Sequence, residues 1–473
     1  MKLKNKLLFL IAALFLFYTT NTFAAGKYDI NRISKSTDEL IKKYLALDIF
    51  SGVVLIAEDG IPFYQKAFGL ADREKKIPNT KNTKFDIGSM NKSFTKVAIL
   101  QLVQEGKINL DDNLGKYLNG FNKTIAENVT IEQLLSHKSG FGDYHFPGYF
   151  DLPIEKRSIS RLLKIIKKME LLFAPGSDRQ YSNTGYVLLG AVIENATGKS
   201  YYQNIRERII EPLGLKETYI DNKDQVPQRA IGYFKNMKGE IRDNQNELEL
   251  PKPDGGFQST VTDILKFYKE YYYGNKLLSD EIKNKEEEFR YVNHKIENGG
   301  VVSAAGGFPG ANTVIFENPR EKLSIVVFAN MDEPVAEQLG LGILDIINNK
   351  IPKEPSLPAI QNVYKAFKEN GETFVFDNFE KLTANFHPTD PKDLILNQIG
   401  YNLLFDDQVD EALSIFKMNI KLFPDIANCY DSYAEALLAS GDKDGALENY
   451  KKALELNPNL PSAVKMVKEL SAN

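Results

Sequence analysis

Two serines and two lysines form overlapping copies of one catalytic pattern, Ser-x-x-Lys, within the stretch FDIGSMNKSFTK at residues 85–96. The first copy is Ser89 with Lys92, and the second is Ser93 with Lys96. On a helix, residues three apart share a face, so either lysine could reach its serine hydroxyl and exchange a proton with it. The pattern alone is weak, because the C-terminal part of the chain repeats it where a solvated helix face is the simpler interpretation. Those copies are Ser414/Lys417, Ser440/Lys443 and Ser462/Lys465.

The expected start of the helix favours Ser89 over Ser93. Apolar residues at helical spacing predict a helix over residues 89–106, with Gly106 at its C-terminus. If Ser89 opens this helix, the free backbone N–H groups and the positive end of the helix dipole stabilise an alkoxide-like nucleophile or an oxyanion. Ser93 would lie one turn further in, where both contributions are smaller.

A serine nucleophile needs a base, and two candidates stay open at this point. Lys92 can accept a proton only if burial or neighbouring positive charge keeps part of it neutral. The alternative is Tyr181, in the stretch PGSDRQYSNTGY, acting as a phenolate next to a lysine. Asn183, two residues later, could donate hydrogen bonds to the lysine and to a substrate amide.

Composition excludes several other classes of chemistry. The four histidines do not form an HExxH motif, and Cys429 is the only cysteine, so the sequence predicts no metal site, no cofactor and no intramolecular disulfide. A formal net charge of −4 does not indicate a nucleic-acid partner.

The N-terminus predicts export. Lys2, Lys4 and Lys6 precede an apolar run from Leu7 to Tyr18, and a small-residue site follows that predicts cleavage after residue 24. The run is too short for a stable membrane span, which needs about 20 residues. Residues 1–24 are therefore expected to be a signal peptide, and the mature protein periplasmic or secreted.

The remaining elements must bring residues 89 and 181 together. Two β-rich runs meet at Asp59-Gly60, a dipeptide that suits a tight hairpin. Helical patterns follow over 131–135, 159–169 and 185–197, and strands return at 301–303, 312–317 and 323–329. This order predicts an α+β domain, with an antiparallel sheet built from both ends, flanking helices and a helical subdomain.

The domain is expected to span residues 26–350, because KIPKEPSLPAI carries three prolines and opens a linker with connecting helices over 351–390. Residues 391–473 repeat with a period of 34 residues, which resembles tetratricopeptide repeats: two copies and a capping helix. Two interpretations stay open for the repeats. They could bind a protein or peptide partner, or they could be a helical buttress packed on the catalytic domain.

Several stretches, in this order, give the chain a resemblance to a known family. They are FDIGSMNKSFTKVAILQLVQEGKINLDDNLGKYL, VTIEQLLSHKSGFGDY, PGSDRQYSNTGYVLLGAVIENATGKSY, IIEPLGLKET and GGFQSTVTDILKF. Together they resemble the serine β-lactamase and penicillin-binding-protein-like hydrolases, in particular the branch with class C β-lactamases, D-alanyl-D-alanine carboxypeptidases and esterases. The resemblance runs from about residue 51 to residue 331.

The resemblance implies a role for each residue of the site. Ser89 becomes the acylated nucleophile, Lys92 its proton partner and Tyr181 the general base, while Asn183 positions the lysine and the substrate. Ser93 and its lysine become helix scaffold.

The third family motif, usually Lys-Thr-Gly or His-x-Gly on a strand at the cleft, falls at Ala304-Ala305-Gly306. Gly307 then supplies an oxyanion N–H beside that of Ser89. Ala304 replaces the cation that helps hold a substrate carboxylate, which is a contact worth roughly 1.5–3 kcal/mol. An uncharged ester or amide should suffer least from this change.

Three neighbouring features have simpler interpretations. His137, in LLSHKSG, is expected to make structural hydrogen bonds rather than to catalyse. Tyr144 and His145 could line the rim of the cleft or lie on a plain loop surface. The charged run over 283–290 is expected to be a solvated helix face.

The sequence therefore predicts an exported serine hydrolase that forms an acyl-enzyme on Ser89. Its expected substrates are small molecules or peptides with ester or amide bonds, of the β-lactam, D-amino-acid peptide or small-ester class. Esterase or D-peptidase activity is expected rather than efficient β-lactamase activity. The alternative is a weakly catalytic or non-catalytic protein that binds cell-wall peptide and recruits a partner through its repeats.

Overall fold

The computed structural model of the 473-residue chain describes residues 27–145, 149, 152–221, 223–245, 249–332, 334–384 and 391–471. The expected signal peptide, residues 1–24, lies outside the described residues, so it stays a prediction. Among the helices that are described, none is both long and apolar enough to cross a bilayer.

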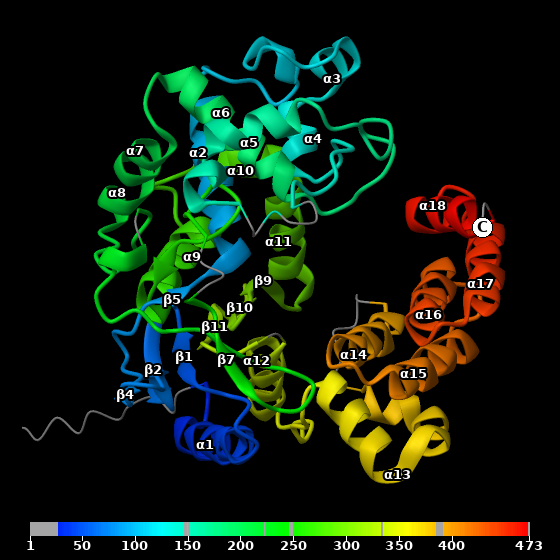
Figure 1. Ribbon diagram of the computed structural model, residues 1–473. Helices are drawn as coiled ribbons and strands as arrows, with labels where there is room; N and C mark the ends of the chain where they lie inside the picture. Colours follow the sequence, from blue (N-terminus) through cyan, green and yellow to red (C-terminus); the bar gives the residue numbers. More distant parts are fainter. Residues whose placement is uncertain are drawn as a thin grey trace, which may run out of the picture.

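One five-stranded antiparallel sheet, in the order β2-β1-β11-β10-β9, joins the two ends of the catalytic domain (Figure 1). β1 pairs with β11 from Gly52↔Ala329 to Glu58↔Leu323. The strands are β1 (Gly52–Glu58), β2 (Ile61–Phe68), β9 (Val302–Phe308), β10 (Ala311–Asn318) and β11 (Leu323–Ala329). The α+β prediction is confirmed.

The sheet is buried on both faces because alternate side chains of its central strands enter two different cores. In β1, Val53 and Leu55 pack into the core that surrounds α2 (Lys92–Gln104), whereas Val54 and Ile56 face α1 (Ile30–Ala46) and α12 (Val335–Ile347). The hairpin to β2 turns at Asp59-Gly60, where both residues have positive φ (46° and 73°). This is the tight-turn geometry that the dipeptide predicts.

A helical lobe lies on the other side of the sheet and surrounds α2 (Lys92–Gln104) (Figure 1). α2 is buried along most of its length, so it is a central helix of the core rather than an amphipathic surface helix. The lobe further contains α3 (Lys123–Asn128), α4 (Ile131–Leu135), α5 (Ile159–Ile166), α6 (Asn183–Thr197), α7 (Tyr201–Ile205) and α8 (Glu211–Leu213). The helices α9 (Val261–Tyr273), α10 (Asp280–Lys285) and α11 (Glu287–Asn298) lead back to the sheet.

The C-terminal part consists of helices that stack in sequence order. They are α13 (Ala359–Leu382), α14 (Asp393–Phe405), α15 (Val409–Leu422), α16 (Ala427–Ser440), α17 (Lys443–Leu456) and α18 (Pro461–Leu470). The small residues of the 34-residue pattern lie where helices cross: a Cβ on Gly400 would come within 2.5 Å of the Phe416 ring. Two helix pairs and a final helix match the predicted repeat architecture.

A hairpin of the catalytic domain packs against the repeats. β6 (Tyr233–Lys235) and β7 (Ile241–Asp243) carry Met237 between them, and Met237 is buried in the same apolar cluster as Val363 and Leu403. Next to it, Lys238 Nζ donates to Asp406 Oδ2 at 2.6 Å. The repeats therefore pack on the catalytic domain, as a buttress would.

Candidate active site

Ser89 lies in a short 3-10 turn, Gly88–Asn91, that leads directly into α2. The sequence predicted that Ser89 would open the α-helix itself, but the first turn is tighter than an α-turn. Asp86, at the end of β5 (Phe85–Asp86), fixes this turn because its Oδ1 accepts from the backbone N–H of Gly88 at 2.9 Å. The N–H groups of such a first turn have no partner within the helix, so they point toward whatever lies in front of it.

Three predicted catalytic side chains meet at one oxygen atom. Ser89 Oγ accepts hydrogen bonds from Lys92 Nζ at 3.0 Å and from the Tyr181 hydroxyl at 2.7 Å. Lys92 is buried, and its Nζ lies 4.9 Å from the centroid of the Tyr181 ring. Nζ also donates to the backbone carbonyl of Asp254 at 2.6 Å, which holds the amine in place between the serine and the tyrosine.

Tyr181 and Asn183 are positioned by the start of α6. Between them, Ser182 caps the helix: its Oγ accepts from Gly185 N at 3.2 Å and donates to the carbonyl of Gly142 at 3.1 Å. Tyr181 is 52% exposed, so its hydroxyl faces the cleft rather than the core.

Asn183 does not bind Lys92, contrary to the expected positioning role. Its Nδ2 donates instead to Asp143 Oδ2 at 2.6 Å, and Asp143 Oδ1 lies 2.6 Å from Nδ1 of His145. Although burial alone would raise the pKa of Asp143, hydrogen bonds from His145 and Asn183 lower it. Sequence reasoning missed Asp143, because a single carboxylate in a loop gives no signal of its partner 40 residues away.

His137 contacts Tyr181 without reaching the serine. Its ring stacks on Tyr181 with centroids 4.7 Å apart, and its Nδ1 accepts from the backbone N–H of Ser182 at 3.2 Å. Burial, together with the positive charges of Lys92, Lys96 and Arg179, lowers the pKa of His137 to about 3. His137 is therefore neutral at physiological pH, which agrees with the structural role expected for it.

The second Ser-x-x-Lys copy is part of the scaffold. Ser93 Oγ lies 3.1 Å from the hydroxyl of Tyr268, and Lys96 Nζ pairs with Glu286 at 2.9 Å and Glu288 at 2.5 Å. The prediction of a solvated face over 283–290 is wrong at Glu286, which is 8% exposed. That error arose because the partner, Lys96, is distant in sequence.

The expected third motif lies against the turn that carries Ser89. A Cβ on Gly306 would come within 2.0 Å of the carbonyl oxygen of Ile87 and 2.8 Å of Ser89 N, so only glycine fits there. Gly307 lines the cavity in front of Ser89. Ala304 is two residues from Gly306 on the same face of β9, partly buried against the core, and its methyl group brings no cation to the site.

A buried polar cluster under the cleft was not predicted. The Tyr144 hydroxyl donates to Asp254 Oδ2 at 2.8 Å, while Lys252 contacts Glu249, which also pairs with Arg157 at 3.0 Å. Tyr144 is buried rather than exposed on a loop, and both Tyr144 and His145 line the cavity. The only sequence signal was the position of Lys252 and Asp254 next to the glycine pair of GGFQST.

Known proteins are similar to this chain in sequence and fold. The family model described as Beta-lactamase matches residues 37–346, which is most of the catalytic domain. The chain belongs to the β-lactamase family. A second family model, Tetratricopeptide repeat, matches residues 427–460, which correspond to α16 and α17.

Individual members of the β-lactamase family are similar over about two thirds of the chain. Penicillin-binding protein 4* of Bacillus subtilis (strain 168) is 30% identical over 316 residues, which are 60% of this chain and 69% of that protein. The octameric penicillin-binding protein homologue of Pyrococcus abyssi is 26% identical, with a TM-score of 0.59, over 72% of this chain and 82% of that one. D-amino acid amidase from Ochrobactrum anthropi SV3 shares the fold at 21% identity, with a TM-score of 0.55, over 67% of this chain and 98% of that one.

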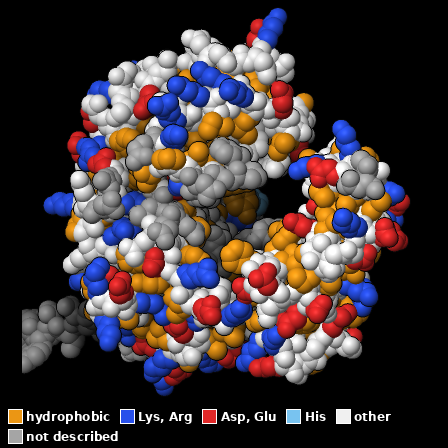
Figure 2. Space-filling view, in the orientation of Figure 1, with side chains coloured by type: hydrophobic (Ala, Val, Ile, Leu, Met, Phe, Trp, Pro, Cys, Tyr) orange, Lys and Arg blue, Asp and Glu red, His pale blue; other side chains and the backbone are white. Residues whose placement is uncertain are grey.

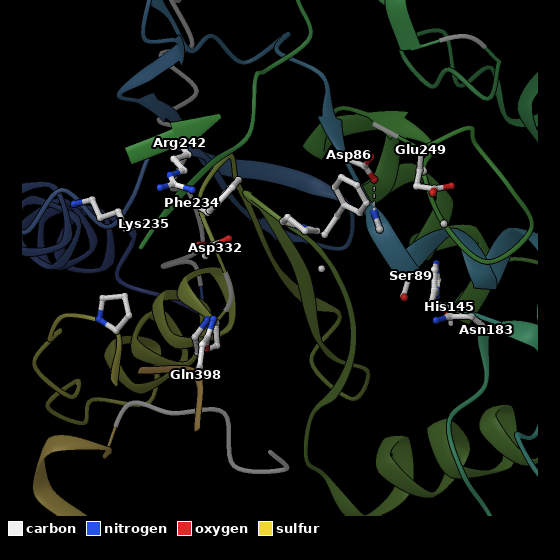
Figure 3. Close-up of a pocket in the computed structure, with 18 of the residues that line it drawn as sticks. Asp86, Ser89, His145, Asn183, Phe234, Lys235, Arg242, Glu249, Asp332 and Gln398 are labelled. Carbon is white, nitrogen blue, oxygen red and sulfur yellow. Dashed lines mark hydrogen bonds between the residues drawn. The ribbon is translucent and has the colours of Figure 1, made fainter. Parts of the chain in front are cut away.

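The cleft of this family member continues beyond the catalytic domain. A cavity of about 760 Å³ contains Ser89, Asn183 and Gly307 at one end, and side chains of α14 line its other end. Figure 3 places Ser89 and Gln398 on separate sides of this cavity, with Asp332 on the side of Gln398. The repeats thus contribute to the surface that a ligand of Ser89 would meet.

Proposed function

We propose that this protein is a serine hydrolase that forms an acyl-enzyme on Ser89. The observation that carries the proposal is the convergence of Lys92 Nζ and the Tyr181 hydroxyl on Ser89 Oγ, at 3.0 and 2.7 Å. The distance to Tyr181 allows direct proton transfer from the nucleophile, and the distance to Lys92 allows its amine to donate a hydrogen bond to the same oxygen. Membership of the β-lactamase family supports the same chemistry.

In the proposed mechanism, Tyr181 in its phenolate form accepts the proton of Ser89 as Oγ attacks the carbonyl carbon of the substrate. The ammonium of Lys92 stabilises the negative charge that moves between the two oxygens. The tetrahedral intermediate then collapses, the bond to the leaving group breaks, and Tyr181 returns the proton to that group. A water molecule attacks the acyl-enzyme by the same route and releases the acid and free Ser89.

The oxyanion of the intermediate would accept hydrogen bonds from the backbone N–H groups of Ser89 and Gly307. The close fit of Gly306 against Ser89 N supports this assignment, because it brings β9 directly beside the nucleophile turn. One donor of this kind typically contributes about 2.7–4 kcal/mol to transition-state stabilisation.

We further propose esters and D-amino-acid amides as the substrate class, in preference to β-lactams. Ala304 leaves the strand without the cation that would hold a carboxylate next to the scissile bond. An uncharged ester or amide has no carboxylate at that place, so it does not need the cation for binding. The fold shared with a D-amino acid amidase is consistent with this choice.

We also propose that the protein is exported. The expected signal peptide, residues 1–24, lies outside the described residues, so it needs its own test. N-terminal sequencing of the mature protein should begin at Ala25 if residues 1–24 are cleaved. A mature chain that retains Met1 would contradict this prediction.

A fluorophosphonate probe tests the catalytic proposal directly. Mass spectrometry of the labelled protein should locate the adduct on Ser89, and Ser89→Ala should abolish labelling. Ser93→Ala is the matched control, since Ser93 has the same Ser-x-x-Lys context one turn further along, and this variant should label normally. If Ser89→Ala still labels, or if the wild-type protein does not, the catalytic proposal fails in favour of a binding protein.

A further inference from the structure

The cavity that contains Ser89 is closed at its far end by a helix of the repeats. Ile395, Gln398 and Asn402 of α14 all line it, and their spacing of three and four residues places them on one face of the helix. Figure 2 shows the molecule hollowed between the catalytic domain and the repeats. Only Ile395 is fully buried; Gln398 is exposed and Asn402 partly exposed.

Two amide side chains on this face have unused hydrogen-bonding capacity. Within the described residues, neither Gln398 nor Asn402 makes a side-chain hydrogen bond. Each amide can donate and accept at once, which suits the alternating N–H and C=O groups of a peptide. The spacing between them, one helical turn, is about 5–6 Å.

Arg242 differs from the other described cations of the cavity wall in its charge pairing. Among the described residues, three other cations line the cavity, and each has a carboxylate partner. These pairs are Lys223 with Asp86, Lys235 with Asp48, and Lys252 with Glu249. Arg242 on β7 is exposed, and no described carboxylate pairs with it. A guanidinium is a strong, bidentate receptor for a carboxylate.

The hairpin that carries Arg242 is held rigidly against α14. Met237 at its tip is 3% exposed within the apolar core of the repeats, and Lys238 pairs with Asp406 at the end of α14. Figure 3 shows Arg242 and Gln398 on the same side of the cavity, away from Ser89. The guanidinium and the two amides therefore line the same end of the cavity, on two elements that pack against each other.

We propose that α14 and the β6–β7 hairpin form a distal substrate subsite, which binds a peptide segment of the substrate that carries a carboxylate. Arg242 binds the carboxylate, and Gln398 and Asn402 bind the peptide groups. The inference rests on the proposed function for the reaction at Ser89, but binding at the subsite requires no turnover. The repeats then select substrates instead of serving only as a support.

Peptide binding by a non-acylating variant tests this proposal. In a Ser89→Ala background, fluorescence anisotropy would measure Kd for a labelled D-alanine tetrapeptide with a free terminal carboxylate and for the same peptide as a carboxamide. We expect the carboxylate form to bind more tightly. Arg242→Ala should weaken its binding roughly tenfold and remove the preference between the two forms. Gln398→Ala combined with Asn402→Ala should weaken both forms about fivefold.

Matched controls are Arg161→Ala on α5 and Asn459→Ala between α17 and α18, since both side chains are exposed and neither lines the cavity. They should leave both Kd values unchanged, and all variants should share one melting temperature. The proposal is overturned if neither peptide binds, if Arg242→Ala keeps the preference for the carboxylate, or if the amide variants behave like the controls. Expected binding without a fluorophosphonate adduct would refute the hydrolase alone and leave the subsite in place.

Discussion

At the residue scale, Ala304 is the position where we expect this chain to lack the cation of its family's third motif. It shares a face of β9 with Gly306, which lies against the nucleophile turn, so a longer side chain at 304 would extend on the side of Ser89. Ala305 is the next residue along the strand and is exposed on the opposite face. A lysine introduced at residue 304 and one introduced at residue 305 would therefore place the same charge on opposite faces of the strand, so the two variants can be compared.

Ala304→Lys should favour substrates that carry a carboxylate next to the scissile bond. A charge-assisted hydrogen bond of about 1.5–3 kcal/mol corresponds to a 10- to 100-fold rise in kcat/KM for such a substrate relative to its uncharged ester. Steady-state kinetics on the matched pair of substrates measures this ratio. Ala305→Lys adds the same charge on the other face and should leave the ratio unchanged; equal effects of both variants would mean that strand position 304 does not face the site.

His137 gives the stability of the protein a predicted dependence on pH. Its folded-state pKa of about 3 lies below the value of about 6.5 expected in the unfolded chain, so the unfolded state binds more protons between these values. The free energy of unfolding must therefore fall as the pH drops below about 6.5, and it is unaffected above that.

His137→Asn should remove this acid sensitivity. Asparagine tolerates the φ of 60° at this position and can still accept the Ser182 N–H. Between pH 7 and pH 5, the variant should lose about 1–2 kcal/mol less stability than the wild-type protein, measured by urea unfolding. If the free energy of unfolding falls equally with pH in the two proteins, then His137 is accessible enough to water in the folded protein to be protonated, and the prediction is wrong.

The site residues that sequence could predict were those whose partners lie nearby in the chain or in a known motif. Ser89 and Lys92 are one turn apart, and Tyr181 belongs to a recognisable stretch. Asn183 was placed correctly at the cleft, but its partner Asp143 was not foreseen. Hydrogen bonds between distant loops depend on how the loops pack, and the periodicity of apolar residues in the sequence does not predict the packing of loops.

At the scale of elements, strands and helices with strong apolar patterns were predicted well. The bounds of β11 and α4 agree with the sequence analysis, because β11 is a short, mostly apolar run and α4 has its apolar residues at helical spacing. The 3-10 turn before α2 was not predicted. Residues three apart lie on one side of both an α-turn and a 3-10 turn, so the sequence pattern does not distinguish the two. The pairing of α2 with the 283–290 segment was missed because it joins residues 190 positions apart.

That pairing should be essential for the stability of α2. The side chains of Lys96 and Glu286 are each only 8% exposed, so removal of Lys96 leaves the buried carboxylate of Glu286 without its cation. Lys96→Met should destabilise the fold by about 3–5 kcal/mol, measured by urea unfolding.

Replacement of both partners, Lys96→Met with Glu286→Met, should restore a large part of that loss, because no buried charge then lacks its main partner. Lys285→Ala is the control: it breaks an exposed pair with Glu281 and should change stability by less than about 0.5 kcal/mol. A double variant as unstable as Lys96→Met would show that the two side chains are not coupled.

At the scale of the whole molecule, the catalytic domain and the repeats share one cavity and one apolar contact. The sequence left two interpretations of the repeats open, a partner groove or a buttress. The structure shows that the repeats pack on the β6–β7 hairpin, and it also places α14 on the cavity wall. Figure 1 shows the repeats rising from α13 to α18 beside the helical lobe. Sequence could not foresee this arrangement, because Met237 is a single apolar residue in the otherwise polar turn at residues 236–240.

Met237→Asp should detach the repeats from the catalytic domain. A carboxylate in the cluster that holds Val363 and Leu403 would be desolvated without a partner, so the contact should open. The segment between α12 and α13 contains Lys350, Lys353 and the 93%-exposed Ile351, and limited digestion with trypsin should cut it several-fold faster in the variant. Lys238→Ala removes only a partly exposed ion pair and should digest like the wild-type protein. Because α14 supplies one wall of the cavity, Met237→Asp should also weaken tetrapeptide binding in the Ser89→Ala background; unchanged digestion and binding would mean that the hairpin does not hold the repeats in place.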